Sequence, residues 1–323
     1  MALRPVPWAI GNGAENSVEL ARAGIYSATG GATGIAESGD FIVKPLPTPG
    51  AAVRVHKGGG VIKSTYPGVF GQSYAVQEQS FTDVPVAATG SAGGATKYVY
   101  VLIEDTQYGG QTPPSVENGP YNDYAVTTTL PQNQPYLLLA KIVQPASTGT
   151  ITNAMITDMR EVANPRRDDV WRPRALVVAD TETLTATGEV GEYFPNNGGP
   201  QTLSIPSWAT RAQIRCEWLS VRYDVGNVWG QMWVEYGPYG GPSQRERSTQ
   251  KYQFDAPPGN SVMRTNWIVV DDVFIPAAYR GTDQLFVPKA RRIGGVSNTV
   301  SLDGVSGMSL QVRFLQVAEP STS

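Results

Sequence analysis

The sequence predicts an all-β protein, and three observations support that fold class. Glycine (35) and proline (25) are frequent among the 323 residues, so turns are closely spaced. Segments such as KYVYVLIEDT and PYLLLAKIVQP are rich in β-branched and aromatic residues. In MSLQVRFLQV apolar side chains alternate with Ser309, Gln311 and Arg313, as in a half-buried strand. We expect an N-terminal extended arm, a β-rich domain and a C-terminal antiparallel β-sandwich of jelly-roll type.

Composition changes along the chain predict where these parts begin and end. Residues 1–50 contain a short helical pattern in ENSVELARAGIYSA but too few apolar residues for a core, so this arm is expected to be bound to a partner. Strand patterns fill residues 51–165. Residues 166–175, within NPRRDDVWRPRA, read as a linker, and turn-separated strands over 176–323 predict the sandwich.

Charge and hydropathy exclude several classes of function. Only 16% of residues are charged, the formal net charge is −3, and no basic run is present, so nucleic acid is not a predicted partner. No apolar run reaches the length of a membrane span. The N-terminus lacks the charged and apolar regions of a signal peptide, so synthesis in the cytoplasm is expected.

The chain has one cysteine, Cys216, and one histidine, His56, far apart in the sequence. This pair excludes the usual zinc constellations, and a lone cysteine in an apolar strand is most often a small core residue. No catalytic residue, metal ligand or cofactor is therefore predicted.

Adjacent acidic residues occur at three places in the chain. Neighbours along a strand point to opposite faces, so neither Glu104–Asp105 nor Asp271–Asp272 forms a two-carboxylate site by itself. Asp168–Asp169 lies in the expected linker. A glycan hydrolase would need acids brought together from different segments.

The aromatic segment NVWGQMWVEYGPYGG, residues 227–241, carries the strongest candidate surface. A period of two puts Val228 and Met232 on one face and the two tryptophans on the other. Three interpretations stay open for the second face: a second packed layer, a subunit interface, or a glycan contact. Its members and the following loop tip are Trp229, Gln231, Trp233, Glu235, Tyr236 and Tyr239.

The segment TITNAMITDMREVANP, residues 150–165, predicts a structural clasp at the end of the β-rich domain. Thr152 is expected to cap one helical turn. Ile156 and Met159 would pack onto the sheet, and Asp158 and Arg160 would tie down the exit strand.

Several segments together resemble a known family. ENSVELAR, ESGDFIVKPLPTPGAAVRVHKGGGVI, GQSY, KYVYVLIEDTQYGG and PYLLLAKIVQPASTGTITNAMITDMR, in this order, resemble the N-terminal module of minor tail proteins of long-tailed bacteriophages, most of all those infecting actinobacteria. The likeness covers residues 15–165 well and the second half loosely. Its most specific part is I-x-x-x-x-I-T-D-x-R, formed by Ile151, Ile156, Thr157, Asp158 and Arg160.

The resemblance implies a non-enzymatic virion protein of the tail tip or baseplate. The N-terminal half would dock on other tail proteins, and the C-terminal β domain would bind a host cell-surface glycan during adsorption. Such proteins are often homotrimers. Two alternatives remain: a stand-alone carbohydrate-binding module, and a tail-associated glycan hydrolase.

Overall fold

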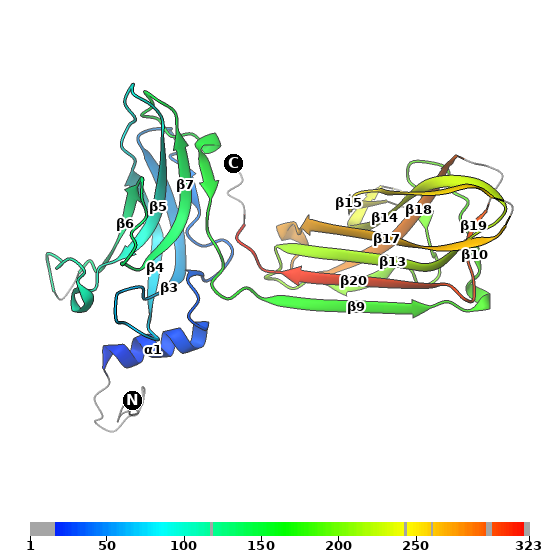
Figure 1. Ribbon diagram of the computed structural model, residues 1–323, viewed down its shortest axis with the longest axis horizontal. Helices are drawn as coiled ribbons and strands as arrows, with labels where there is room; N and C mark the ends of the chain where they lie inside the picture. Colours follow the sequence, from blue (N-terminus) through cyan, green and yellow to red (C-terminus); the bar gives the residue numbers. More distant parts are fainter. Residues whose placement is uncertain (1–16, 117–118, 242–243, 260, 295–298, 320–323) are drawn as a thin grey trace. The chain divides into compact units, whose positions relative to one another are not determined.

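The computed structural model describes residues 17–116, 119–241, 244–259, 261–294 and 299–319. Their strands form four sheets with antiparallel pairing, which confirms the predicted all-β class (Figure 1). The chain divides into two compact units. The first unit comprises residues 1–165 and 317–323, and the second comprises residues 166–316. The second unit is thus an insertion in the chain of the first.

Two sheets make up the first unit. In one, the long strand β3 (Ala52–Lys63) pairs with β1 (Gly34–Ile35), β2 (Val43–Pro45) and β4 (Ser73–Pro85). The other runs in the order β6 (Asn122–Thr127), β5 (Ala95–Ile103), β7 (Tyr136–Gln144) and β8 (Ile156–Asp158).

Alternating side chains of both sheets build the core of the first unit. Val53 and Val55 are fully buried, whereas Arg54 between them pairs with Asp83 on the neighbouring strand. The second sheet contributes apolar residues such as Leu139 to the same cluster. This arrangement follows the period of two that the AAVRVH segment predicts.

The helix α1 (Val18–Thr29) begins where the Ser17 side chain accepts a hydrogen bond from the Leu20 N–H and ends at Gly30, whose φ of 62° suits glycine. No residue of α1 is fully buried. A polar contact attaches it to the first unit, because Arg22 pairs with Asp105 at 2.8 Å.

The prediction of a separate arm over residues 1–50 is wrong for its described part. Ile35, Phe41 and Val43 are buried in the core of the first unit, since β1 and β2 pair with β3. Apolar residues too few for a core of their own therefore complete a core formed by later strands. Residues 1–16 lie outside the described residues, and binding of a partner by this region stays a prediction.

Two sheets also form the second unit (Figure 1). The first of them contains β9 (Arg167–Ala175), β20 (Gly307–Leu315), β13 (Arg211–Tyr223), β17 (Met263–Phe274), β19 (Val300–Leu302) and β10 (Glu182–Thr183). The other contains β11 (Glu192–Tyr193), β12 (Gln201–Ser204), β18 (Asp283–Gly294), β14 (Gly226–Gly241), β15 (Gln244–Ser248) and β16 (Tyr252–Gly259). Short 3₁₀ turns are η1 (Thr106–Tyr108), η2 (Asn153–Met155), η3 (Val178–Asp180) and η4 (Ala277–Tyr279).

Aromatic side chains dominate the core of the second unit. Trp267 stacks on Phe254 with ring centroids 4.3 Å apart, and its Nε1 donates to the hydroxyl of Tyr223 at 2.6 Å. Cys216 is buried in the same cluster, and burial raises the pKa of its thiol. Tryptophan N–H groups that find partners let large rings be buried without an unpaired donor.

The predicted linker at residues 166–175 is also wrong, because most of it is the strand β9. β9 pairs along its whole length with β20, from Arg167 opposite Leu315 to Ala175 opposite Gly307. Most β9 side chains are exposed, so backbone pairing rather than a hydrophobic pattern places this edge strand. The sandwich accordingly begins before residue 176.

The C-terminal boundary differs as well, because residues 317–319 belong to the first unit. Ala318 packs against its core, and the N–H of Glu319 donates to the carbonyl of Ser38 at 3.0 Å. Among the described helices none is long and apolar enough to cross a bilayer.

Candidate binding site of the second unit

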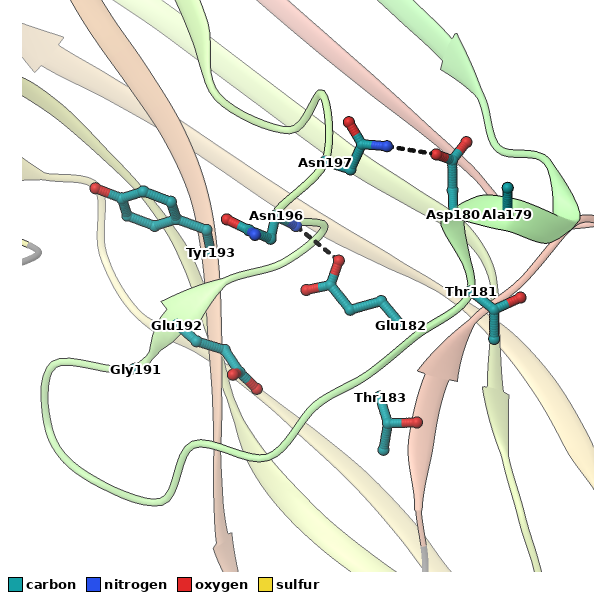
Figure 2. Close-up of a pocket in the computed structure, with 10 residues that line it drawn as sticks. All are labelled: Ala179, Asp180, Thr181, Glu182, Thr183, Gly191, Glu192, Tyr193, Asn196 and Asn197. Carbon is teal, nitrogen blue, oxygen red and sulfur yellow. Dashed lines mark hydrogen bonds between the residues drawn. The ribbon is translucent and has the colours of Figure 1, made fainter.

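A polar cleft of about 610 Å³ opens between two facing segments of the second unit (Figure 2). One segment runs from η3 into β10, and the other runs from β11 into the following turn. Its lining is Ala179, Asp180, Thr181, Glu182, Thr183, Gly191, Glu192, Tyr193, Asn196 and Asn197. We refer to this space as the cleft.

Hydrogen bonds fix the acidic side chains of the cleft in place. The Glu182 carboxylate accepts from the backbone N–H of Asn196 at 2.8 Å, and Asp180 accepts from the Asn197 amide at 2.6 Å (Figure 2). The Glu192 carboxylate accepts from the Thr185 hydroxyl at 3.0 Å and from the N–H groups of the segment that follows β10.

The environment of the cleft shifts the protonation of one of these acids. Burial raises the pKa of Glu182, and the negative charge of Glu192 raises it further, against the lowering effect of the Asn196 and Asn197 N–H groups. Two carboxylates from different strands thus face one space, with one of them biased toward its neutral form. The cleft offers acceptors, hydroxyls and amides, which suit the hydroxyl groups of a sugar.

Replacing Glu182 with glutamine is expected to raise the free energy of unfolding of the second unit at neutral pH. The folded-state pKa lies above the unfolded value of 4.5, so ionised Glu182 costs stability above its folded pKa. That cost disappears as the pH falls to the unfolded pKa. Denaturant titrations from roughly pH 4 to 8 should show a gain that shrinks toward the acidic end. A gain independent of pH would contradict this account.

The structure divides the predicted aromatic surface of residues 229–239. Trp229 and Tyr239 are 36% and 69% exposed, whereas Trp233 is fully buried. Tyr236 is also buried, and it stacks on Phe286 in the core with centroids 5.4 Å apart. The prediction of a loop tip at Tyr236 is wrong because β14 continues to Gly241, with shifts of the pairing register after Tyr236.

Trp233 lies on the face of β14 that is opposite the core, yet a second packed layer covers it. A Cβ on Gly191 would lie 2.5 Å from the Trp233 ring, so the backbone before β11 passes directly over the indole. The Lys251 ammonium lies 4.4 Å from the ring centroid. Of the three interpretations, the packed layer therefore applies to Trp233.

The remaining predicted polar residues of this strand have partners within that layer. Glu235 is 4% exposed and accepts from the Trp233 Nε1 at 2.9 Å and from the Lys289 ammonium at 3.2 Å. Gln231 accepts two hydrogen bonds from the guanidinium of Arg291, at 3.0 and 2.7 Å. As a continuous exposed surface, the predicted set does not exist.

The predicted clasp of residues 152–160 is a 3₁₀ turn followed by the strand β8. The Thr152 side chain makes no capping hydrogen bond, because the Met155 N–H closes the turn on the Thr152 carbonyl. Met159 is 36% exposed rather than packed on the sheet, whereas Ile156 packs against the core. The strand period turns residues 157 and 159 outward and residues 156, 158 and 160 inward.

Asp158 and Arg160 form the centre of this segment. The guanidinium binds both carboxylate oxygens of Asp158, at 2.9 and 2.7 Å, and its side chain is only 1% exposed. It also donates to the carbonyls of Ser38, Asp40 and Glu319. We call these five residues the Arg160 cluster, which joins three stretches distant in sequence.

Sequence reasoning missed the acids of the cleft. Glu182 and Glu192 stand in the short strands β10 and β11, separated by the glycine-containing stretch TLTATGEVG. Strands of two residues leave no detectable hydrophobic period. Within the described ranges, no group of His, Cys, Asp and Glu is arranged to hold a metal ion.

No family model and no curated protein matches the chain. Among solved structures, a particle of infectious bursal disease virus, Gx strain, aligns over 89% of this chain and 74% of its own, with 12% identity and a TM-score of 0.20. An empty particle of Kashmir bee virus aligns over 51% and 97%, with 13% identity and a TM-score of 0.18. The Cry4Aa toxin of Bacillus thuringiensis aligns over 90% and 53%, with 11% identity and a TM-score of 0.20.

Proposed function

We propose that the chain is a structural virion protein of a phage tail tip or baseplate, in which the first unit docks on the tail. The second unit then presents a glycan-binding surface to the host cell. The observation that carries this proposal is the Arg160 cluster. Asp158 and Arg160 belong to the sequence segment that most specifically resembles minor tail proteins, and they hold the first unit together. The resemblance therefore includes residues whose side chains connect three stretches of the first unit.

The insertion of the second unit into the chain of the first supports separate roles for the two units, docking for the first and host contact for the second. The chain leaves the first unit after residue 165 and returns at residue 317. A unit inserted in this way keeps its own core, so its surface can differ from protein to protein without altering the docking unit. We infer that the docked form is a homo-oligomer, with a trimer as the expected state.

The first unit also presents an apolar side chain suited to docking. Phe70 is 91% exposed, on the loop that joins β3 and β4. Tyr66 anchors that loop, because its buried hydroxyl donates to the Ile103 carbonyl at 2.7 Å and accepts from the Asp105 N–H at 3.0 Å. A fully exposed aromatic residue on an anchored loop is typical of a protein contact.

Antibodies raised against the second unit are expected to label the distal end of intact virions and to block adsorption. Electron microscopy of labelled particles and plaque-reduction assays provide the two measurements. Antibodies against the Phe70 loop are the matched control, and they should bind free protein but not the assembled virion. Labelling elsewhere on the particle, or an accessible Phe70 loop, would contradict the proposed arrangement.

A tail-associated glycan hydrolase is the second candidate, because Glu182 and Glu192 come from different strands and line one cleft. It requires Glu182 as the proton donor and Glu192 as the ionised partner. Release of reducing sugars from host envelopes by the wild-type chain but not by the Glu182→Gln variant would favour it over a binding role.

A further inference from the structure

One sheet of the second unit has an open outer face that the candidate site does not use. It is formed by four neighbouring strands in the order β9, β20, β13 and β17. Register pairing places Trp171, Gln311, Arg215 and Val270 in one row across these strands. Successive strands lie about 4.8 Å apart, so the row spans roughly 14 Å.

Trp171 is the most prominent residue of this outer face. It is 63% exposed, although tryptophan usually buries most of its large surface. Its Nε1 donates to the Ser309 hydroxyl on the neighbouring strand at 2.8 Å. That hydrogen bond satisfies the only polar atom of the indole and fixes its orientation, while most of the ring stays open to solvent.

Beside this ring the face is hollowed and lined by groups that form hydrogen bonds. A depression of about 560 Å³ is bordered by Gln213, Arg215, Val270, Asp272, Gln311 and Arg313. Among the described residues, the side-chain amides of Gln213 and Gln311 have no intramolecular partner. Each such amide offers two donors and an acceptor, which is the complement of a sugar hydroxyl.

The charges of the outer face compensate one another. Arg215 pairs with Glu217 at 2.5 Å, and Arg211 pairs with Asp272 at 2.9 Å. Arg313 and Arg167 share Asp169, at 2.6 and 2.5 Å respectively. Because these guanidinium groups already have carboxylate partners, the face has little excess positive charge for an anionic ligand.

We propose that this outer face binds an uncharged polysaccharide, which stacks one sugar ring on Trp171 and donates and accepts hydrogen bonds at Gln311 and Gln213. The inference rests on the proposed function, since it names the ligand class and a second surface through which the inserted unit would contact a glycan. A flat, oriented aromatic ring next to free amides provides both the apolar contact and the polar specificity that a sugar requires.

The test is binding of the full chain to a printed array of uncharged glucose, galactose and mannose oligomers, with sulfated and uronic-acid oligomers alongside. We expect binding to at least one uncharged oligomer. For the best of these, calorimetry should show an affinity at least about tenfold lower in Trp171→Ala and partly restored in Trp171→Phe. The matched control is Trp229→Ala, which removes an exposed tryptophan from the other sheet and should leave binding unchanged.

Three results would overturn the proposal: no uncharged oligomer bound, binding restricted to anionic oligomers, or equal affinity in the wild type and Trp171→Ala. Thermal unfolding of each variant distinguishes lost binding from lost folding. The Trp171 variants should unfold near the wild-type temperature, because Trp171 is an exposed residue of an edge strand. These readouts are independent of virion labelling. If the chain binds no uncharged glycan but antibodies still label the distal end of the virion, only the proposed glycan surface is contradicted. If the chain binds a glycan but the distal end is not labelled, the proposed role in adsorption is contradicted.

Discussion

The Arg160→Met variant is expected to lower the free energy of unfolding of the first unit by about 3–5 kcal/mol. The substitution leaves the Asp158 carboxylate without its bidentate partner and removes the donor shared by the carbonyls of Ser38, Asp40 and Glu319. Breaking a buried ion pair by removing one partner costs far more than the intact pair contributes, because the other charge remains unpaired.

Hydrogen exchange followed by mass spectrometry is the suitable measurement, because six of the seven tryptophans lie in residues 166–316 and fluorescence reports on the second unit. Peptides of β3 and β7 should lose protection. The control is Arg54→Met, which breaks the exposed pair with Asp83 and should change stability little. The account fails if both variants exchange alike. Arg160→Lys keeps the charge but not the planar fork, so an intermediate loss is expected.

The Glu235→Leu variant is expected to destabilise the second unit by about 3–5 kcal/mol at neutral pH. Lys289 is fully buried, and its ammonium has both Glu235 oxygens at 3.2 Å. Without that carboxylate the folded state must bury an unpaired cation or release its proton.

The pH dependence of this variant has a definite sign. Burial already lowers the pKa of Lys289 in the folded protein, and loss of Glu235 removes the opposing charge that raises it. The unfolded state then holds more protons than the folded state between the two pKa values, so the destabilisation should shrink as the pH rises. Tryptophan fluorescence during denaturation measures it directly.

The control for Glu235→Leu is the double variant Glu235→Leu/Lys289→Met. It removes both charges and should recover much of the lost stability. Recovery should be incomplete, because Trp233 Nε1 and the Arg245 N–H lose their acceptor. A double variant as unstable as Glu235→Leu would show that packing, rather than the buried ammonium, limits stability.

Periodicity predicted the strands that have one buried face. The alternation of residues 308–314 corresponds to β20, and that of residues 228–234 orients β14 correctly toward the core. It did not predict β9, because only Val170 of this strand packs against the core and most of its side chains are exposed, so its sequence resembles a linker. The hydrophobic period of a sequence shows which residues face the core. The pairing of an edge strand depends instead on backbone N–H and C=O groups, which are present in every sequence.

The candidate sites were less predictable than the strands, because they depend on which segments, far away in the sequence, pack over or beside a given residue. The face of β14 with Trp233 is outward in the strand pattern, but the chain around Gly191 folds over it. The same long-range packing brings Glu182 and Glu192 to one cleft. Asp158 and Arg160 were predicted to tie down the exit strand, but the backbone carbonyls to which Arg160 donates could not be read from sequence spacing.

The two connections between the units, at residues 165–166 and 316–317, have a mechanical consequence. Residues 166 and 316 are hydrogen-bonded to each other, since the Gln316 N–H donates to the Arg166 carbonyl at 3.0 Å and the Arg166 N–H donates to the Gln316 side chain at 3.2 Å. β9 and β20, which continue from them, are paired neighbours. A force that pulls on the second unit is therefore shared between two connections of the same polypeptide rather than carried by one. A single protease cut in either connection would leave this unit tethered.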